Sequence, residues 1–530
     1  MRGWVLSLAV IFLASSCQNS QKDENKKNPL IKIAFEKEPT SLDPRKATDL
    51  TTANALHMIY EGLMRIDYHG NVTPGIAESV DISPDQKTYT FQLRNSQWSD
   101  GTPLTANDFE ESWKSLLSPQ FPAPNAYQFY YIKGAKDYKE GKVNFDHVGI
   151  KAKDPNHLVV ELEHPTPYFL KLVSAFFYLP TSPQIRQSSL VDQVEPVCNG
   201  PYKLEKWKHQ NEIVLVRNPN YWDEKVVSID RIALIMLDEH TSLNMFEMGQ
   251  LDYVGSPTST LPQDAIATLH SQKILKIKPA AATHWFRFNT EAFPLNHPKV
   301  RKAFNLALDR KAIVEHVTQG NQLPAIGIVP PIVSWKKMHY YKDHDIPAAW
   351  ELFQQALVEM NIDKDSFPPL KLTYAATDRY HKIAQAVQQQ WNHAFGIQIE
   401  LQSLEPKIFS ENVLKGEYQI ATGSWYADFS DPINFLEIFK YKTNPSNRTK
   451  WENNEYIALL NQSSNETNPE RRTQYLERAE ALLMEDMPIA PLFFGSYNYL
   501  ESEYIGGIGL SDLGILDLKY AFIEDVEDPN

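Results

Sequence analysis

The chain has 530 residues, of which 42% are hydrophobic and 22% charged, and its formal net charge is −14 at pH 7. An acidic balance of this size argues against a surface that binds nucleic acid or an anionic membrane, and it favours a small ligand or a protein partner. A chain of this length and hydrophobic content can bury its own core, and we expect two or three lobes.

The first 17 residues have the pattern of an export signal. Arg2 is followed by the apolar run "WVLSLAVIFLA" and then by small residues that lead to Cys17. The run is too short to be a stable membrane span, so we predict a signal peptide over residues 1–16. The residues before Cys17 resemble the lipobox of bacterial lipoproteins, although Ala14 and Ser16 stand where Leu and Gly or Ala are usual. The resemblance implies lipidation of Cys17, and the alternative is an exported protein without a lipid.

A polar segment follows the cysteine. Residues 17–29 contain "QNSQKDENKKN", which has no apolar residue, and we predict a flexible tether that is anchored through the lipid. Cys198 is the other cysteine of the chain. If Cys17 is acylated, no disulfide framework can form within the chain, so a hydrophobic core must hold the fold.

The next elements in chain order indicate alternating strands and helices. "IKIAFEK" (31–37) and "YTFQLR" (89–94) are typical of strands, and Asp100-Gly101 is typical of a tight turn before a helix that Thr105 caps. The spacing of apolar residues over 298–317 predicts two consecutive helices, with Asp309 as the N-terminal cap of the second helix. A helix over 379–396 that ends at Gly396 leads into a strand at 397–404, an order that favours an α/β lobe.

The common enzyme signatures are absent from the sequence. It contains no His-Glu-x-x-His zinc motif, no Gly-x-Ser-x-Gly elbow and no phosphate-binding loop. His339 and His344 are the closest histidine pair, and on a surface loop such a pair seldom binds a metal. We therefore predict neither a metal site nor a cofactor.

The carboxylate of Asp428 is the candidate functional group. The segment "ATGSWYADFSDPINF" (421–435) has no Lys or Arg, and Asp431 with Pro432 already provides the cap and the first position of a helix predicted over 432–441. A carboxylate in such apolar surroundings costs several kcal/mol to desolvate unless a cation pairs with it. The cation is either a group on a ligand or a distant Lys or Arg of the chain.

Several collinear segments resemble one protein family. "EKEPTSLDPRKATD" (36–49) and "QWSDGTPLTANDFEESW" (97–113) resemble signature segments of the periplasmic oligopeptide-binding proteins, the peptide and nickel class of solute-binding proteins that feed ABC importers. "NGPYKLEKW", "LVRNPNYWD", "FRFNTEAFPLNHPKVRKAFNLALDR" and "GSWYADFSDPINF" follow in the family's order. The resemblance covers essentially the whole mature chain.

The resemblance implies the fold and the domains. It predicts a two-lobed, hinged α/β fold of the periplasmic-binding-protein type with an extra domain, which closes on its ligand like a clamshell. Domain I is expected to be discontinuous, domain II is the extra domain, and the boundaries are 30–62, 196–284 and 502–530 for domain I, 63–195 for domain II and 285–501 for domain III.

The resemblance also implies a binding site. In the family, the Asp that matches Asp428 meets the α-ammonium group of the bound peptide. Trp425 and Tyr426 would form rigid walls against which an extended peptide lies like an added strand. Glu38 and Thr40 would flank the peptide from the other side, mainly through backbone groups.

The anchor for the peptide's carboxyl end departs from the family pattern. His381 matches the family's histidine at that end, but the family's arginine positions fall near Val413 and Thr422. No Arg occurs between positions 379 and 448, and Lys415 is the candidate substitute. The amino-end anchor is therefore the better supported of the two.

The predicted function is peptide capture rather than catalysis. We expect a monomeric lipoprotein, exported to the periplasm and attached to a membrane through its lipid, that delivers oligopeptides or cell-wall peptides to the permease subunits of an ABC transporter. Dipeptides, nickel and haem are alternative cargoes. An exported hydrolase with Asp428 and His381 as an acid-base pair is the alternative from another class.

Overall fold

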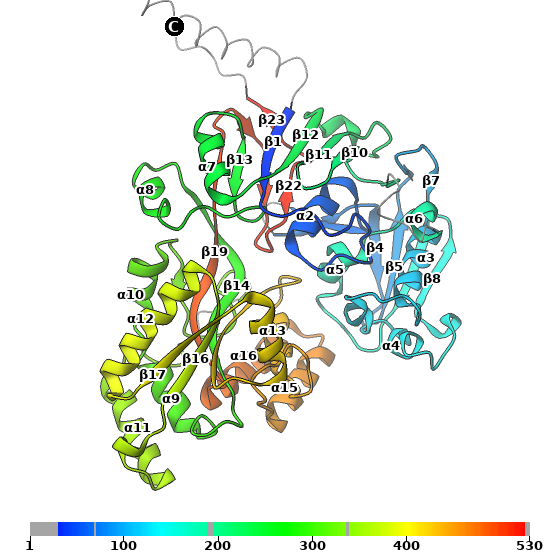
Figure 1. Cartoon of the computed structure of the whole chain (residues 1–530). Coiled ribbons are helices and arrows are strands. Elements are labelled where there is room, and N and C mark those ends of the chain that lie inside the picture. The colour runs from blue at the N-terminus through cyan, green and yellow to red at the C-terminus, as the bar shows by residue number, and fades with distance from the viewer. Residues whose placement is uncertain (1–29, 68–69, 188–195, 335–338, 525–530) are drawn as a thin grey trace, which may run out of the picture.

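A mixed sheet passes through both lobes of the molecule (Figure 1). The structure is a computed structural model that describes residues 30–67, 70–187, 196–334 and 339–524. Within these ranges the sheet has 11 strands in the order β10-β11-β12-β1-β13-β19-β14-β18-β16-β17, and β15 (Leu323–Pro324) pairs with β19. The predicted leader, the tether and Cys17 lie outside the described residues.

Two long strands connect the lobes. β14 (Lys276–Phe288) and β19 (Ile489–Glu501) have 13 residues each and pair antiparallel, from Lys276 opposite Tyr499 to Arg287 opposite Ile489. The register shifts between Pro279 and Thr283, close to the passage from one lobe to the other (Figure 1). The predicted boundary at 284/285 falls inside β14, and both domain boundaries and hinge closure stay predictions.

The first lobe holds the amino-terminal strand. β1 (Leu30–Phe35) pairs in parallel with β12 and β13, and Ile31 and Ile33 are fully buried, which confirms the strand predicted here. The remaining elements of this lobe are β10 (Tyr202–Lys208), β11 (Glu212–Arg217), β12 (Arg231–Met236), β13 (Tyr253–Gly255), α2 (Leu50–Ile59), α7 (Glu239–Glu247), α8 (Ile266–Ser271) and the short pairs β20 (Ile505–Gly506) with β23 (Phe522–Ile523) and β21 (Gly509–Leu510) with β22 (Leu516–Asp517).

A separate antiparallel sheet lies within the predicted extra domain. Its order is β4-β5-β9-β8, and the strand predicted at 89–94 is confirmed as β5 (Thr88–Leu93). Thr105 precedes α3 (Ala106–Leu117) as predicted, and its backbone N–H donates to Asp108 Oδ2 at 3.0 Å. The other elements are β2 (Met64–Ile66), β3 (Val72–Pro74), β4 (Ala77–Ile82), β6 (Ser96–Gln97), β7 (Pro103–Leu104), β8 (Ile150–Asp154), β9 (His157–Glu161), α4 (Ala135–Lys139), α5 (Phe169–Leu172) and α6 (Pro183–Gln187).

The second lobe is an α/β unit, as its helix and strand order predicts. β16 (Leu370–Ala375) pairs in parallel with β17 (Ile399–Leu404) and β18 (Ile420–Tyr426), and β18 pairs antiparallel with β14. Its helices are α9 (Pro298–Leu306), α10 (Arg310–Ala312), α11 (Ile346–Met360), α12 (Asp378–Phe395), α13 (Pro406–Lys415), α14 (Ile433–Leu436), α15 (Asn454–Asn465) and α16 (Pro469–Asp486).

The helix ends of this lobe follow the sequence signals. Asp309 Oδ1 accepts from the N–H of Ala312 at 2.9 Å, which confirms the cap, although the second helix continues as a π-helical turn over Ile313–Thr318. Gly396 caps the end of α12 as predicted, and its φ of +62° is a left-handed conformation that glycine adopts without strain.

The single helix predicted over 432–441 is wrong in its length. α14 covers only Ile433–Leu436, and a 3-10 turn follows over Glu437–Phe439. The side-chain amide of Asn444 donates to the carbonyl of Glu437 at 3.3 Å, so a side chain takes a carbonyl that a longer helix would have used. Asp431 does accept from the N–H of Ile433 at 3.0 Å, so the predicted cap is present.

The apolar core of the first lobe crosses the predicted boundary between domains II and III. One buried cluster joins the first lobe and the extra domain to α14, α15 and α16, and Phe429 stacks on Tyr168 with ring centroids 5.0 Å apart. A second cluster around Phe304 and Trp391 belongs to the second lobe alone. The segment that carries Asp428 is therefore packed between the lobes.

Candidate functional site

Asp428 lies just beyond β18, where a network of amides surrounds it. The side chain of Gln128 donates from Nε2 to Asp428 Oδ2 at 2.9 Å. Asn434 Oδ1 accepts from the N–H of Asp428 at 3.2 Å and from the indole of Trp425 at 2.7 Å. Asn434 thus ties the loop that bears the carboxylate to the neighbouring indole.

No Lys or Arg side chain of the described ranges forms an ion pair with Asp428 within 4.0 Å. Burial raises the pKa of Asp428 from 3.8 to about 6, although the hydrogen bonds from Gln128 and Asn434 act in the opposite direction. Desolvation disfavours the charged form of a carboxyl group when no opposite charge compensates for it. The sequence left two possible partners for Asp428, a cation on a ligand or a distant Lys or Arg. No Lys or Arg among the described residues takes that place.

Two cavities meet at this carboxylate. One has a volume of about 1180 Å³ and the other about 540 Å³, and Tyr127, Trp425 and Asp428 line both. The larger cavity is lined from the extra domain and from the segment after Asp428, and its polar groups include Tyr130, Tyr131, Asn444, Asn461, Ser464 and Asn465. Asp428 can therefore face a ligand group in either space.

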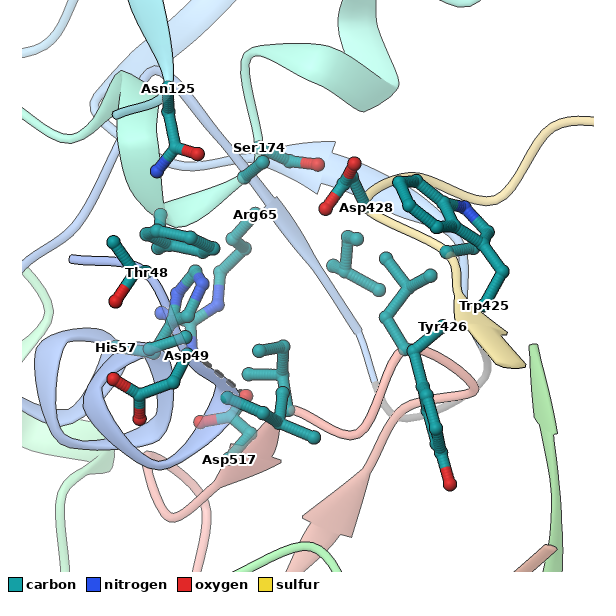
Figure 2. Close-up of a pocket in the computed structure, with 18 of the residues that line it drawn as sticks. Thr48, Asp49, His57, Arg65, Asn125, Ser174, Trp425, Tyr426, Asp428 and Asp517 are labelled. Carbon is teal, nitrogen blue, oxygen red and sulfur yellow. Dashed lines mark hydrogen bonds and ion pairs between the residues drawn. The ribbon is translucent and has the colours of Figure 1, made fainter. Parts of the chain in front are cut away.

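The smaller cavity is bounded by both lobes. Figure 2 shows Asp428 and Trp425 on one side of it and His57, Arg65 and Asp49 on the other. Arg65 is already paired, at 2.8 Å to Asp517 and 3.3 Å to Glu61.

The cavity's histidine carries no charge near neutral pH. Burial, together with the nearby charge of Arg65, lowers the pKa of His57 to about 4. Since Arg65 is matched by its own carboxylates, the charges that line this cavity leave an excess of negative charge, which favours a cationic or neutral ligand group over an anionic one.

The aromatic residues predicted beside Asp428 occupy different positions. Trp425 is half-buried and borders both cavities. Tyr426 borders only the smaller one, is 43% exposed, and its ring points away from Asp428 in Figure 2. The hydroxyl of Tyr426 lies 3.4 Å from His284 Nε2. Their contacts with a ligand stay predictions.

The loop with Glu38 and Thr40 lies outside the lining of both cavities. Glu38 accepts from the indole of Trp207 and lies 2.8 Å from His209 Nδ1. Thr40 is exposed, and its N–H donates to Thr52 Oγ1 at 2.9 Å. Neither Glu38 nor Thr40 lines a cavity at Asp428, so their role beside the ligand stays a prediction. Thr48 and Asp49, a few residues further along the chain, line the smaller cavity.

The candidate groups for the carboxyl end are also away from Asp428. His381 is exposed on α12, and its Nδ1 lies 2.7 Å from the hydroxyl of Tyr374. Lys415 is exposed at the end of α13, while Val413 and Thr422 are buried. Since His381 pairs with Tyr374 and Asp428 with Gln128, the acid-base pair of the hydrolase alternative is not assembled in this conformation.

Sequence reasoning missed the residues that hold the carboxylate. Gln128 is 300 positions before Asp428 and no local pattern marks it. Asn434 had a weak signal, because it follows Asp428 within the same quoted segment and a short polar side chain there can bond to nearby backbone.

The described residues contain no cluster of three or more His, Cys, Asp or Glu side chains that could hold a metal ion. His344 Nδ1 instead lies 3.4 Å from Asp309 Oδ2. Cys198 is buried, with its thiol 3.5 Å from the carbonyl of Tyr202. None of the helices in the described ranges has the length and apolar character that crossing a bilayer requires.

Comparison with known proteins places the chain in a family. Residues 71–447 match the profile of the bacterial extracellular solute-binding proteins, family 5 Middle. The chain is 38% identical over 513 residues to the oligopeptide-binding protein OppA of Bacillus subtilis, an alignment that covers 95% of this chain and 94% of that protein. It therefore belongs to family 5 of the bacterial extracellular solute-binding proteins.

Solved structures agree with this assignment. Haemophilus influenzae OppA in complex with RPPGFSPFR matches with a TM-score of 0.79 and 27% identity, over 94% of this chain and 99% of that one. The Escherichia coli murein tripeptide binding protein MppA matches with a TM-score of 0.81 and 26% identity, over 94% and 98%. The predicted two-lobed α/β fold is thereby confirmed.

The raised pKa of Asp428 predicts an unusual stability effect. Because the folded-state pKa of about 6 exceeds the ordinary 3.8, the ionised carboxylate destabilises the ligand-free fold at pH 7.5. We expect Asp428→Asn to raise the free energy of unfolding at pH 7.5 by about 1 to 3 kcal/mol, and the gain to shrink as the pH falls through 6 toward 4. Thermal and denaturant unfolding of ligand-free protein at several pH values measure it.

Asp431→Asn is the matched control. Asp431 and Arg472 form a buried ion pair at 2.7 Å, with side chains 4% and 3% exposed. Breaking such a pair leaves an uncompensated buried charge, so this substitution should destabilise the fold by about 3 to 5 kcal/mol. Equal losses of stability in both variants would contradict the assignment of Asp428 as an unpaired carboxylate.

Proposed function

We propose that this chain captures peptides between its lobes and delivers them to the membrane subunits of an ABC importer. The observation that carries the proposal is the Asp428 carboxylate, which lies at the junction of two cavities and has no cationic partner among the described residues. An α-ammonium group supplies the missing charge, and its arrival lowers the pKa of Asp428 because an opposite charge favours the ionised form.

The relatives support a peptide as the cargo. The Bacillus subtilis relative is named for oligopeptides, and the Haemophilus influenzae structure holds the peptide RPPGFSPFR. The cavity of about 1180 Å³ exceeds the usual range for small-molecule pockets, which suits several residues of an extended chain. Besides Lys136, Glu437 and Lys440, its wall carries uncharged polar side chains, which suit the backbone amides of peptides of varied sequence.

The alternative cargoes fit less well. Nickel requires a set of ligand side chains, and the described residues offer no such cluster. An excess of carboxylates in the smaller cavity disfavours the propionate groups of haem. Dipeptides share the ammonium group, so cavity size rather than Asp428 decides between them and longer peptides.

The remaining features of the proposal concern the cellular setting. We infer export to the periplasm, attachment to a membrane through a lipid on Cys17, and action as a monomer that binds its cargo without converting it. Incubation of purified protein with peptide, ester and glycoside substrates tests the last point, since turnover of any of them would favour the hydrolase alternative.

The ammonium contact predicts a specific thermodynamic coupling. We expect Asp428→Asn to weaken peptide binding by about 2 to 5 kcal/mol, or about thirtyfold to several thousandfold, because the ligand's charge becomes buried without a partner. N-acetylation of the peptide removes the same pair from the other side. The two changes should be strongly non-additive in a calorimetric double cycle at pH 7.5, and additive penalties would exclude direct pairing.

The carboxyl end predicts a weaker effect. His381 and Lys415 are exposed and border neither cavity, and the arginine positions of the family fall near Val413 and Thr422. Of the lysines that line the larger cavity, Lys136 is exposed and Lys440 lies 3.8 Å from Glu437. Amidation of the peptide's carboxyl end should therefore change binding by less than about 1 kcal/mol. A hundredfold loss in the same calorimetric assay would indicate a cationic anchor for the carboxylate.

Lipidation of Cys17 predicts how the protein fractionates. Cys17→Ser should release the protein from the membrane fraction of the producing cells, because the acyl chains provide the anchor. Immunoblots of soluble and membrane fractions measure the change, with Cys198→Ser as the control that keeps the anchor. Unchanged sedimentation of the Cys17→Ser protein with membranes would rule out this attachment.

A further inference from the structure

Gln128 is held rigidly within the predicted extra domain. It lies in a 3-10 turn, Ala126–Phe129, and is only 3% exposed. Its carbonyl accepts from the hydroxyl of Tyr178 at 2.9 Å, and Phe129 stacks on the same ring with centroids 4.1 Å apart. The position of the Gln128 side chain is therefore set by the core of the extra domain.

The amide of Gln128 reaches the carboxylate across the chain. Nε2 donates to Asp428 Oδ2 at 2.9 Å and lies 3.1 Å from the hydroxyl of Tyr127. A hydrogen bond from a neutral amide to a carboxylate stabilises its charged form without neutralising it. One carboxylate oxygen is thus occupied, and its charge remains available to a cation.

Further contacts hold the segment after Asp428 against the same domain. The hydroxyl of Tyr131 donates to Glu437 Oε2 at 2.8 Å, and Lys171 Nζ donates to the carbonyl of Ser430. Together with the stacking of Phe429 on Tyr168, these contacts hold Asp428 within hydrogen-bonding distance of Gln128.

We propose that Gln128 is a positioning residue for ligand binding: its amide holds Asp428 Oδ2 so that Oδ1 meets the ligand's ammonium group. The inference rests on the proposed function and deepens it, because it makes the extra domain part of the binding site. Gln128 also keeps Asp428 ionised at a lower pH than the cavity alone would allow, so it sets the pH range in which the ligand binds.

The other charged groups near Asp428 do not take over this role. Tyr127 is the ionisable neighbour that responds to Asp428, which together with burial raises the pKa of the phenol well above its usual value. Lys171 is directed to a backbone carbonyl. The remaining titratable groups that line the two cavities are Asp49, His57, Arg65, Tyr426 and Asp517 in the smaller and Tyr130, Tyr131, Lys136, His164, Tyr168, Glu437, Lys440 and Tyr441 in the larger.

The test compares Gln128→Met with a matched substitution elsewhere. Met keeps the length of the side chain and removes the donor. Gln322→Met is the control, because Gln322 is also buried, at 7% exposed, and bonds to Thr318 rather than to the site. The pKa of Asp428 is read in ligand-free protein by carbon-13 NMR of labelled aspartate, with Asp428→Asn to assign the signal, and binding of a free-amine peptide is measured at pH 6 and pH 8.

Gln128→Met should raise the pKa of Asp428 by about one unit, the scale of one lost hydrogen bond to a charged group. A rise from about 6 to about 7 reduces the ionised fraction at pH 6 about fivefold and at pH 8 by only about a tenth. Affinity should therefore fall about fivefold more at pH 6 than at pH 8, while Gln322→Met leaves the ratio unchanged.

Equal losses at both pH values with an unchanged pKa of Asp428 would overturn the proposal, since a general disturbance of the fold has no reason to follow the titration. Gln128→Asn, whose amide is one methylene too short, should shift the pKa in the same direction and serves if the Met variant does not fold. If Gln128→Met raises the pKa of Asp428 in ligand-free protein, but the unsubstituted protein binds no peptide at any pH, the Gln128 contact is supported and the proposed function is refuted.

Discussion

A half-buried carboxylate with no counter-ion among the described residues is the constraint on which the site depends. Asp428 lies among aromatic side chains and two amides, and burial raises its pKa to about 6. A fold can hold such a group only if neighbouring contacts fix it, because a mobile carboxylate would turn toward water or take a proton. Gln128 and Asn434 provide those contacts while leaving the net charge in place. The unpaired charge of Asp428 thus both lowers the stability of the ligand-free fold and allows the site to bind a cation.

The same constraint explains why three parts of the chain converge here. β18 and the loop after it supply Asp428 and Trp425, the predicted extra domain supplies Gln128, Tyr127 and Arg65, and the first lobe supplies His57. β14 and β19 connect the lobes, while the stacking of Phe429 on Tyr168 joins the Asp428 segment to the extra domain.

Local signals predicted much of the secondary structure. Asp309, Thr105 and Gly396 lie at helix ends because short polar side chains and glycine satisfy backbone groups or conformations that only the chain nearby determines. The prediction of a longer helix after Asp431 failed because Asn444 takes a carbonyl from outside the helix, a contact that depends on how the following loop folds back.

The sequence by itself determined the family, the α/β character of the fold, and that Asp431 rather than Asp428 caps the following helix. Each of these depends on residue types at short spacing, which the chain carries wherever it folds. Only the tertiary structure decided that Gln128, 300 residues away, holds Asp428, and that Glu38 and His381 bond to Trp207 and Tyr374 rather than line the cavities. Such contacts arise from the packing of whole domains, and a residue's partner across a domain contact leaves no pattern in the residues next to it.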